Sequence, residues 1–426
     1  MIVWLLTVGE PMPGDGGQGR AWRTGMLAEQ LAARGHEVVW WSSAFDHFSR
    51  RLRSPVDTRI AQGPGLSVYF LGGMAYRRNV SLARLRNHHQ VARAFSRLAP
   101  AEPSPDVILS SLPTLELCDA AVKFGKDRGI PVALDVRDLW PDVFFDLVPG
   151  VVRPIARHMV PWMTAQLRRS TAGAAAILGV TDAFVDWGAA AAGRTRTTDD
   201  RAFPMGYSER VPAEDDLRRA GEFWDGHGIP ATGSRPVFCF FGTFGWMFDF
   251  DTVLKAAAML NQPGTGARFV LCGGGERLEQ LRQAAAGLDN VLFPGFVGPA
   301  EIWTLMRRSV AGLAPYRDFR NFDDNLPNKP IEYLSAGLPI VASQVRVLAS
   351  LIGEHACGFT YAHGDAPALS AALRAIGEDP VRQQAMAARA RVLFEHRYVA
   401  ERVYGEMAGH LEGLARVRRG ASGIIQ

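Results

Sequence analysis

The chain has 426 residues, of which 47% are hydrophobic and 21% are charged. These values are ordinary for a globular protein, and they exclude a disordered or collagen-like chain. A single hydrophobic core rarely grows beyond about 250–300 residues, so we expect two domains. The net charge is +4, which makes the chain only mildly basic.

The four cysteines, Cys118, Cys239, Cys272 and Cys357, are far apart and form no CxxC pair. This spacing argues against a disulfide framework or a zinc knuckle and favours a reducing compartment. No apolar run approaches the roughly 20 residues that a membrane span requires. The first eight residues have neither the basic region nor the cleavage site of a signal peptide, so we expect a first strand there and a cytoplasmic protein.

Apolar runs typical of buried strands alternate with helical patterns in the first half of the chain. Strands are expected at 2–8, 37–43, 106–111, 131–136 and 172–179, and helices at 20–34 and 115–128. Gly35 stands where a glycine often ends a helix. This alternation predicts a parallel sheet with helices on both faces.

The second half repeats this pattern. Strands are expected at 236–243, 267–275, 290–296, 310–316 and 339–343, helices at 250–260 and 276–286, and helices again from Pro367 onward. The polar, proline-containing stretch 194–235 separates the two halves. We therefore predict an N-terminal domain over 1–203, a linker over 204–235, a C-terminal domain over 236–400, and a final helix and tail over 401–426. Two doubly wound domains facing a cleft would bind ligands at the carboxyl ends of their strands.

Basic residues are concentrated in one part of the N-terminal half. Between His47 and Arg97 there are ten arginines and one acid, Asp57. Such a cluster favours an anionic partner, which can be a phospholipid, a diphosphate-linked acceptor or nucleic acid. A solvated, arginine-rich surface is the alternative. The nearby pair His88–His89 is expected to be solvated, because no carboxylates stand at the spacing of metal ligands.

The segment 14–19 matches G-x-G-x-x-G and lies between a predicted strand and a predicted helix. This is the setting of a dinucleotide-binding loop, but the next strand ends in Ser42-Ser43 and lacks the acid that would hold a ribose. We therefore do not expect NAD binding. Small residues such as Gly16 and Gly17 still allow an anion or a sugar to approach a helix N-terminus closely. A tight turn without a ligand is the alternative.

An acid–lysine–acid pattern follows the predicted strand 310–316. Asp324 precedes Glu332 by eight residues, and Lys329 stands between them. Carboxylates can accept paired hydrogen bonds from vicinal sugar hydroxyls, so Glu332 suits a ribose and Asp324 a donor sugar. Lys329 can neutralise a diphosphate, together with N–H groups at the start of a helix. A helix cap with surface ion pairs is the alternative.

The sequence PNKPIEYLSAGLP at 327–339 resembles the E-x7-E region of retaining GT-B glycosyltransferases of family 4, in the bacterial envelope-polysaccharide or O-antigen branch. Further motifs of that family occur in the expected order, namely the Gly16-Gly17 loop, RGHEV at 34–38, DVRDLWPD at 135–142, FFGTFGWMFDFDTVL at 240–254 and LCGGGE at 271–276. The resemblance covers nearly the whole chain. It implies a GT-B fold with the donor in the C-terminal domain, the acceptor in the N-terminal domain, a C-terminal helix crossing back to the N-terminal domain, and no metal or other cofactor.

For the donor, the residues and the resemblance together predict a set around the acid–lysine–acid segment and the glycine loops: Glu332, Asn325, Leu326, Gly242, Thr243, Gly245, Gly274, Glu276, Phe296 and Val297. The chain departs from the family pattern in two places. Asp324 stands where relatives have Glu, and the loop 245–249 lacks the Arg and Lys that many relatives use for the diphosphate. We therefore expect Lys329 to take the phosphate role, helped by backbone N–H groups near 242–245.

The acceptor side is predicted around the end of strand 131–136. The resemblance implies that Arg137-Asp138 stand where many relatives have a histidine near the donor's reacting carbon, and a carboxylate there can orient the acceptor hydroxyl or the donor's 6-position. Lys329, Asp324 and Asp138 are thus the candidate catalytic residues, with Gly16, Gly17, Asp135 and Arg137 on the acceptor side. Asp135 and Arg137 can equally form a structural ion pair. The apolar run from Phe144 to Trp162 is either a core-facing helix or an interfacial segment beside a lipid-linked acceptor.

These patterns predict a retaining transferase that moves a hexosyl or N-acetylhexosaminyl group from a nucleoside-diphosphate sugar, UDP-linked by preference, to a membrane-associated or lipid-linked saccharide. Peripheral contact with the anionic inner face of the cell membrane is part of this expectation. Two alternatives remain open, a nucleotide-sugar 2-epimerase of the same architecture and a non-catalytic subunit that binds a nucleotide sugar or saccharide. Nucleic-acid binding is the weakest interpretation, because the arginine-rich stretch lacks interleaved aromatic residues.

Overall fold

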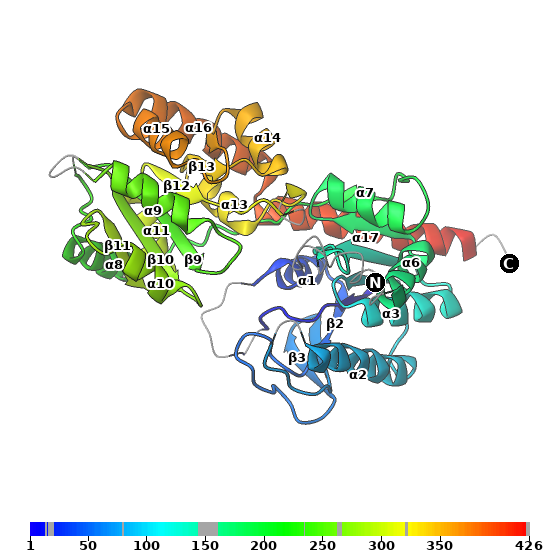
Figure 1. The fold of residues 1–426 in the computed structure, drawn as a ribbon. Coiled ribbons are helices and arrows are strands. Elements are labelled where there is room, and N and C mark those ends of the chain that lie inside the picture. Colours follow the sequence, from blue (N-terminus) through cyan, green and yellow to red (C-terminus); the bar gives the residue numbers. More distant parts are fainter. Residues whose placement is uncertain are drawn as a thin grey trace. The chain divides into compact units, whose positions relative to one another are not determined.

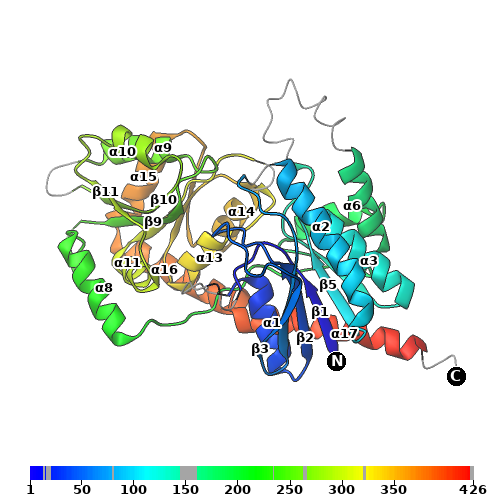
Figure 2. The ribbon, with the colours of Figure 1, turned by 90° about the horizontal axis from the view of Figure 1, so that it is seen from below.

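The computed structural model describes residues 1–12, 15, 21–78, 81–143, 161–233, 235–261, 266–319 and 323–422. The chain divides into two compact units, one formed by Met1–Gly206 with Ala400–Gln426 and the other by Tyr207–Val399. We call them unit 1 and unit 2. Within each unit helices pack on a sheet whose strands are almost all parallel (Figures 1 and 2). The predicted fold class is therefore confirmed.

Unit 1 contains a sheet that, over the described residues, has eight strands in the order β3-β4-β2-β1-β5-β6-β7-β8. All neighbours pair in parallel except β3 and β4, which form an antiparallel hairpin. The strands are β1 (Ile2–Leu6), β2 (Glu37–Ser43), β3 (Thr58–Gly63), β4 (Leu66–Leu71), β5 (Val107–Ser111), β6 (Val132–Val136), β7 (Ala176–Gly179) and β8 (Arg201–Ala202).

Two apolar layers, one on each face, hold the unit 1 sheet. In β1, Val3 and Leu5 belong to one layer and Trp4 and Leu6 to the other, because successive side chains of a strand point to opposite faces. One layer is completed by α2 (Leu82–Leu98), α3 (Leu115–Arg128), α6 (Pro161–Gly173) and α7 (Asp182–Ala191), and the other by α1 (Arg23–Ala33) and α17 (Ala400–Ser422). A short 3-10 helix, Ala99–Ala101, follows α2. Burial on both faces explains why these strands read as uninterrupted apolar runs.

The C-terminal helix α17 belongs to unit 1, although unit 2 lies between them in the sequence. It packs along α1, and the hydroxyl of Tyr404 accepts a hydrogen bond from the backbone N–H of Gly206 at 3.0 Å. His36, at the start of β2, contacts Glu412 of α17 at 2.9 Å. The predicted return of the last helix to the N-terminal domain is thus confirmed, and His36 has a structural role.

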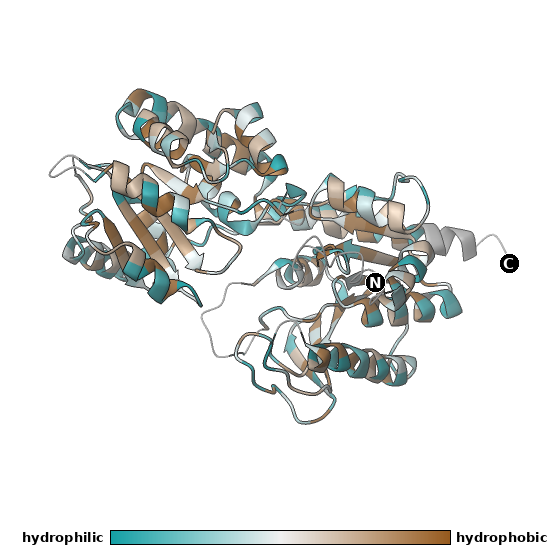
Figure 3. Ribbon diagram, viewed as in Figure 1, coloured by the Kyte–Doolittle hydropathy of each residue, from teal (hydrophilic) through white to brown (hydrophobic). Residues whose placement is uncertain are grey.

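Unit 2 contains a parallel sheet with, among the described residues, six strands in the order β11-β10-β9-β12-β13-β14. Hydrophobic residues run along its strands (Figure 3). The strands are β9 (Val237–Thr243), β10 (Arg268–Gly274), β11 (Val291–Gly295), β12 (Ala311–Ala314), β13 (Ile340–Ser343) and β14 (Gly358–Tyr361). Because all of them are parallel, the loops that follow their carboxyl ends lie at one edge of the sheet.

Helices of unit 2 pack in pairs, α8 on α11, α9 on α15 and α13 on α16. The helices are α8 (Glu214–Gly226), α9 (Phe250–Met259), α10 (Leu278–Ala284), α11 (Pro299–Arg308), α13 (Asn328–Ser335), α14 (Arg346–His355), α15 (Ala366–Gly377) and α16 (Pro380–Arg397). The stretch predicted as a linker, 204–235, thus contains α8, whose Trp224 is fully buried and donates to the carbonyl of Glu301 at 2.8 Å.

Two further details differ from the sequence-based expectation. The range 172–179 was expected as one strand, but its first residues close α6 and only Ala176–Gly179 form β7. The arginine-rich stretch contains β3, β4 and α2, which the apolar periodicity did not indicate. No helix among the described residues is both long and apolar enough to cross a bilayer.

Candidate functional site

Two glycine-containing strand ends lie side by side at the carboxyl edge of the unit 2 sheet. β9 and β10 are paired so that Gly242 is opposite Gly273. Their φ angles are 145° and 127°, and a Cβ atom at Gly273 would collide with the carbonyl oxygen of Gly242. Glycine is therefore required here, because any side chain would separate the two strand ends.

The ammonium group of Lys329 lies against this pair of strand ends. A Cβ atom at Gly242 would overlap Lys329 Nζ, and Nζ lies 4.9 Å from the ring centroids of both Phe240 and Phe248. Burial lowers the pKa of the Lys329 ammonium, and the Glu332 carboxylate opposes this shift. Among the described residues, Lys329 therefore places a cation at the base of the glycine loops, and aromatic faces hold it there.

Helix α13 carries both Lys329 and Glu332. Its N-cap residue is Pro327, and no side chain caps the first turn, so the helix start presents backbone N–H groups that can bind an anion. The helix is anchored by Tyr333, which is fully buried and donates its hydroxyl to the carbonyl oxygen of Leu313 at 3.0 Å. Glu332, half-buried, follows Lys329 by three residues and so lies on the same side of the helix.

Asp324, the first acid of the pattern, forms an ion pair with Arg346 at the start of α14. The adjacent Asp323 accepts a hydrogen bond from the backbone N–H of Arg346 at 3.0 Å. Arg346 did not emerge from the sequence analysis, because it lies beyond the acid–lysine–acid segment and no local spacing connects it to Asp324. Its side chain is 63% exposed, so the ion pair is at the surface of unit 2.

Two further arginines reach the loop 245–249, which contains no basic residue of its own. Arg277 binds both carboxylate oxygens of Asp251, at 3.1 and 3.0 Å, and donates to the carbonyl of Phe248 at 3.3 Å. Arg317 donates to the same carbonyl at 3.3 Å and lies 3.6 Å from Asp251. Both guanidinium groups thus support the loop through the Phe248 carbonyl and are held by Asp251, whereas the Lys329 ammonium lies at Gly242.

The remaining predicted donor residues surround this edge. Thr243 and Glu276 are exposed at the ends of β9 and β10. Phe296 is 84% exposed, and one edge of its ring lies against Gly274, so that a Cβ there would require the ring to move. Others of the set are half-buried or buried in the loops, namely Val297, Asn325, Leu326 and Gly245. The structure therefore gathers the predicted donor residues at one edge of one unit.

The acceptor-side prediction for Asp135 needs correction. Asp135 has no exposed side-chain surface and accepts hydrogen bonds from Arg23 at 2.9 Å and from Arg137 at 2.6 Å. Burial would raise the pKa of the Asp135 carboxyl, but the charges of both arginines hold it well below its ordinary value. Asp135 is therefore structural, because a fully enclosed carboxylate cannot contact a substrate.

Arg137 belongs to the same buried network. Its guanidinium also pairs with Glu10 and donates to the hydroxyl of Thr24 at 2.8 Å. Glu10 in turn accepts the backbone N–H of Thr24 at 3.1 Å. This network fixes the start of α1 to the ends of β1 and β6. Arg137 is thus held in structural contacts too. The alternative interpretation, that Asp135 and Arg137 form a structural ion pair, was therefore correct.

Asp138 has a different environment. It is half-buried, and its charge raises the pKa of Arg84, against the lowering by burial. It therefore lies near a guanidinium from α2 at the carboxyl edge of the unit 1 sheet. Gly16 and Gly17, as well as 144–160 of the apolar run, lie outside the described residues, whereas Trp162 is 47% exposed on α6.

The histidine pair His88–His89 was predicted to be solvated, which is wrong for His88. Its side chain is 1% exposed, and its Nδ1 lies 3.8 Å from Glu116 of α3. Only His89 is exposed. His88 lies on the buried side of α2. The arginines near it in the sequence gave no indication of this burial.

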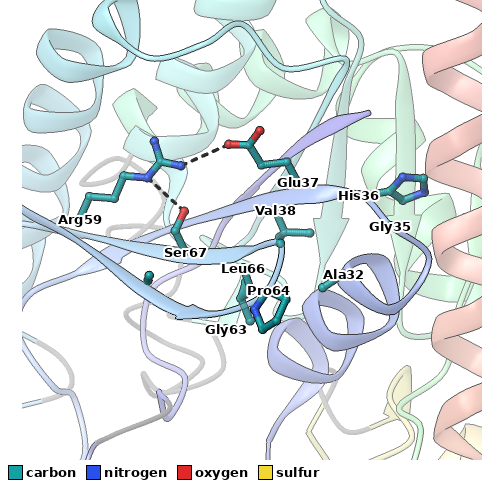
Figure 4. A pocket seen from close by; sticks show the side chains of 12 residues that line it. Ala32, Gly35, His36, Glu37, Val38, Arg59, Gly63, Pro64, Leu66 and Ser67 are labelled. Atoms are coloured by element: carbon teal, nitrogen blue, oxygen red, sulfur yellow. Dashed lines mark hydrogen bonds and ion pairs between the residues drawn. The ribbon is translucent and has the colours of Figure 1, made fainter.

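A pocket of about 610 Å³ lies in unit 1 at the edge of the sheet where β2 begins. It is formed by the end of α1, the start of β2 and the β3–β4 hairpin, and Arg59 crosses its wall to Glu37 and Ser67 (Figure 4). Ligands of parallel α/β sheets bind at the carboxyl ends of the strands, whereas this pocket is at the amino end of β2. We therefore assign the candidate site to the carboxyl edges instead.

Comparison with known proteins agrees with the division of the chain into two units. Residues 228–392 match the family model of glycosyl transferases group 1, and residues 18–198 match the model of the glycosyl transferase 4-like domain. Each match falls within one unit. Each unit therefore matches a glycosyltransferase family model of its own.

Among curated proteins, the amylovoran biosynthesis glycosyltransferase AmsK of Erwinia amylovora is 31% identical over 169 residues, or 38% of this chain. The match spans 41% of that protein's length. Among solved structures, sucrose-phosphate synthase from Thermosynechococcus elongatus has a TM-score of 0.70 at 19% identity, covering 98% of this chain and 99% of its own. Anabaena HepE in complex with UDP-glucose has a TM-score of 0.64 at 15% identity, covering 97% and 100%. These structures show that the fold is GT-B.

Proposed function

We propose that the protein is a retaining glycosyltransferase that transfers a sugar from a nucleoside-diphosphate sugar, UDP-linked by preference, to a saccharide acceptor in bacterial envelope polysaccharide synthesis. The observation that carries this proposal is the position of Lys329. Its ammonium lies at Gly242, beside an uncapped helix start and three residues before Glu332. A diphosphate at the glycine loops would meet the cation and the N–H groups, and a ribose would meet the glutamate.

The leaving group explains why a buried cation suits this site. When the bond from the anomeric carbon to the diphosphate oxygen breaks, negative charge develops on the diphosphate. Lys329 and backbone N–H groups would stabilise that charge in a site of low polarity, where such stabilisation is large. Phe240 and Phe248 exclude water from one side of the ammonium, which strengthens the interaction further.

We further propose that the acceptor hydroxyl attacks the anomeric carbon on the face that the diphosphate leaves. The new bond joins the anomeric carbon to the acceptor oxygen, and the hydroxyl proton passes to the departing phosphate oxygen. Asp324 would hold the donor sugar and Asp138 would orient the acceptor. No metal is required in this scheme, so we expect transfer to persist in excess EDTA.

Support for the substrate classes comes from relatives. AmsK is described as an amylovoran biosynthesis enzyme, and HepE was crystallised with UDP-glucose. Another structure of this fold, WaaG, with a TM-score of 0.63, acts in lipopolysaccharide biosynthesis. These names favour a UDP-sugar and an envelope saccharide, and we adopt both as part of the proposal, with a lipid-linked acceptor as its most specific form.

The test is a transfer assay with a panel of UDP-sugars and saccharide acceptors, followed by NMR of the product. We expect an α-linked product from an α-linked donor. A β-linked product would refute the retaining mechanism, and epimerised nucleotide sugar formed without any acceptor would replace the transferase by an epimerase. A donor that binds but is never consumed would indicate a binding subunit.

A further inference from the structure

We propose that Trp246, supported by Phe319, binds one face of a pyranose ring at the carboxyl edge of the unit 2 sheet. We call these two side chains the aromatic platform. The binding of a sugar ring depends only on the geometry and chemistry of the platform, whereas its part in transfer rests on the proposed function. The platform adds to that function a side chain that holds the sugar ring itself.

Trp246 stands at the tip of a tight turn that follows β9. The backbone N–H of Phe248 donates to the carbonyl of Gly245 at 3.3 Å. Trp246 and Met247 are therefore the two central residues of a four-residue turn. At its start, the N–H of Gly245 also donates to the carbonyl of Thr243 at 3.0 Å. Both ends of the turn are thus fixed by backbone hydrogen bonds.

The segment that follows β12 fixes the same turn from the side. The backbone N–H of Asp249 donates to the carbonyl of Pro315 at 2.7 Å. In the opposite direction, the N–H of Arg317 donates to the carbonyl of Met247 at 3.0 Å. Between these two contacts the segments share an antiparallel bridge. They therefore form a short ribbon beyond the sheet, and a rigid ribbon of this kind can hold a side chain in one binding geometry.

The ring of Phe319 supports the indole of Trp246. The two ring centroids are 4.9 Å apart and the ring planes are inclined by 80°, which is the edge-to-face arrangement that aromatic pairs favour. Phe319 is half-buried, and its carbonyl accepts the backbone N–H of Asp323 at 2.9 Å. Trp246 nevertheless remains 41% exposed, so this contact leaves aromatic surface open to a ligand.

The chemistry of this surface favours a pyranose ring. A face of such a ring presents C–H groups, whose slightly positive hydrogens suit the negative face of an aromatic ring. The hydroxyl groups lie around the rim of the sugar, where they need hydrogen-bond partners. The indole N–H of Trp246 donates to no other residue that the structure describes. It can therefore donate to a hydroxyl of a sugar that lies on the indole.

The position of the platform favours the sugar over the base of a nucleotide sugar. Phe248 belongs to the same turn, and its ring centroid lies 4.9 Å from Lys329 Nζ, so the platform adjoins the proposed diphosphate site. The platform lies on the β12 side of β9, together with the segment that leads to Asp324. Phe296, an exposed ring on which a base can stack, follows β11 on the other side.

The sugar ring can belong to the donor or to the acceptor, and titration calorimetry with UDP, UDP-glucose and UDP-galactose tests the donor. If the ring belongs to the donor, Trp246→Ala should weaken the more tightly bound UDP-sugar at least fivefold and change the UDP affinity less than twofold. Trp246→Phe keeps an aromatic face and should lose less affinity than Trp246→Ala.

The matched control is Met259→Ala, which removes another exposed apolar side chain of unit 2. Met259 is 47% exposed and is the last residue of α9. Because α9 leads from the carboxyl end of β9 to the amino end of β10, Met259 lies at the opposite edge of the sheet from Trp246. This variant should change the affinity for each ligand less than twofold.

Saturation-transfer NMR with methyl α-glucopyranoside and methyl α-galactopyranoside tests the acceptor, both with and without UDP. If the ring belongs to the acceptor, the protons of one sugar face should receive the strongest saturation from the wild type and from Met259→Ala. That pattern should disappear in Trp246→Ala. A loss of stability alone would weaken all sugar protons equally, so the pattern distinguishes contact with the indole from a structural effect.

A loss in Trp246→Ala confined to the UDP-sugars assigns the ring to the donor, and a loss confined to the methyl glycosides assigns it to the acceptor. Unchanged binding of every sugar in Trp246→Ala, equal losses for UDP and the UDP-sugars, or the same losses in Met259→Ala would overturn the proposal. A wild type that binds none of these sugars would overturn it as well. A wild type that binds the methyl glycosides through Trp246 but does not bind UDP would instead refute the proposed function, so the two can fail independently.

Discussion

Two kinds of buried ionisable side chain occur in unit 1, those paired with an opposite charge and those whose neutral form is favoured by burial. Asp135 is of the first kind, because Arg23 binds it through two parallel contacts of 2.9 Å. His88 and Glu116 are of the second kind. Burial and the charge of Arg84 lower the pKa of His88 to about 3, and burial raises the pKa of Glu116 to about 7.

We predict that Asp135→Asn lowers the free energy of unfolding by about 3–5 kcal/mol, because it leaves Arg23 as an uncompensated buried charge and leaves Arg137 with Glu10 alone as a carboxylate partner. Urea unfolding followed by tryptophan fluorescence measures the effect. The control is Asp119→Asn, which removes a surface carboxylate 3.4 Å from Arg169 and should cost less than about 1 kcal/mol. Similar losses in both variants would show that Asp135 is not a buried anchor.

Glu116 predicts a pH dependence of stability. Its pKa of about 7 is above the ordinary value of 4.5, so the folded state retains a proton that the unfolded chain releases. Stability from this group is complete below about pH 4.5 and is lost as the pH rises to about 7. His88 is neutral throughout this range, because its pKa is lower still.

The variant Glu116→Gln keeps the side-chain shape and cannot titrate. Relative to this variant, the wild type should lose about 2–3 kcal/mol of unfolding free energy between pH 4.5 and pH 8. Urea titrations at several pH values test this, with Glu29→Gln on the exposed surface of α1 as control. A constant difference between wild type and Glu116→Gln across this range would contradict the assignment.

Single elements determine where the candidate groups lie. Helix α13 contains Lys329 and Glu332. Its position is fixed by Tyr333, whose hydroxyl donates to the carbonyl oxygen of Leu313 in β12. Helix α17 completes unit 1, because one of the two apolar layers on that sheet includes residues from Ala400 to Ala415. Helix α17 is the more unusual of these two helices, since the chain passes through all of unit 2 before it returns to unit 1.

We predict that Leu411→Ala, at a fully buried position of α17, destabilises unit 1 by about 2–5 kcal/mol through the cavity that it leaves. Hydrogen exchange followed by mass spectrometry should show faster exchange in α1 and β1 and no change in α9 or β10. The matched control is Glu406→Ala on the exposed side of α17, with an effect within about 0.5 kcal/mol. Faster exchange in α9 and β10 as well would contradict the division into units.

At the scale of the molecule, much of the fold could be predicted from the sequence. Strands such as β2 and β9 are buried on both faces, so their apolar runs are uninterrupted and easily located. β3 could not be located this way, because it is an edge strand with mostly exposed or half-buried residues. α8 was missed because it lies in a polar stretch and buries mainly Ala220 and Trp224.

Some features of the candidate site could likewise be predicted from the sequence, and others could not. The placement of Lys329 beside the glycine loops was predictable, because it depends on a motif within one segment and on the rule that ligands meet strand carboxyl ends. The ion pair between Asp324 and Arg346 was not, because Arg346 lies on another helix. The role of Asp135 was left open between two alternatives because Arg23, 112 positions away, has no local signal. The catalytic roles themselves stay predictions.

The most direct test of the account is titration calorimetry of UDP and UDP-glucose with the wild type, Lys329→Ala and Lys255→Ala. Lys255 is exposed on α9 of the same unit, so it controls for the loss of a positive charge, and circular dichroism verifies that each variant is folded. We predict that the wild type and Lys255→Ala bind the same ligand with affinities within twofold, and that Lys329→Ala binds it at least tenfold more weakly. Unchanged affinity in a folded Lys329→Ala variant would contradict the central claim that this ammonium holds the donor diphosphate.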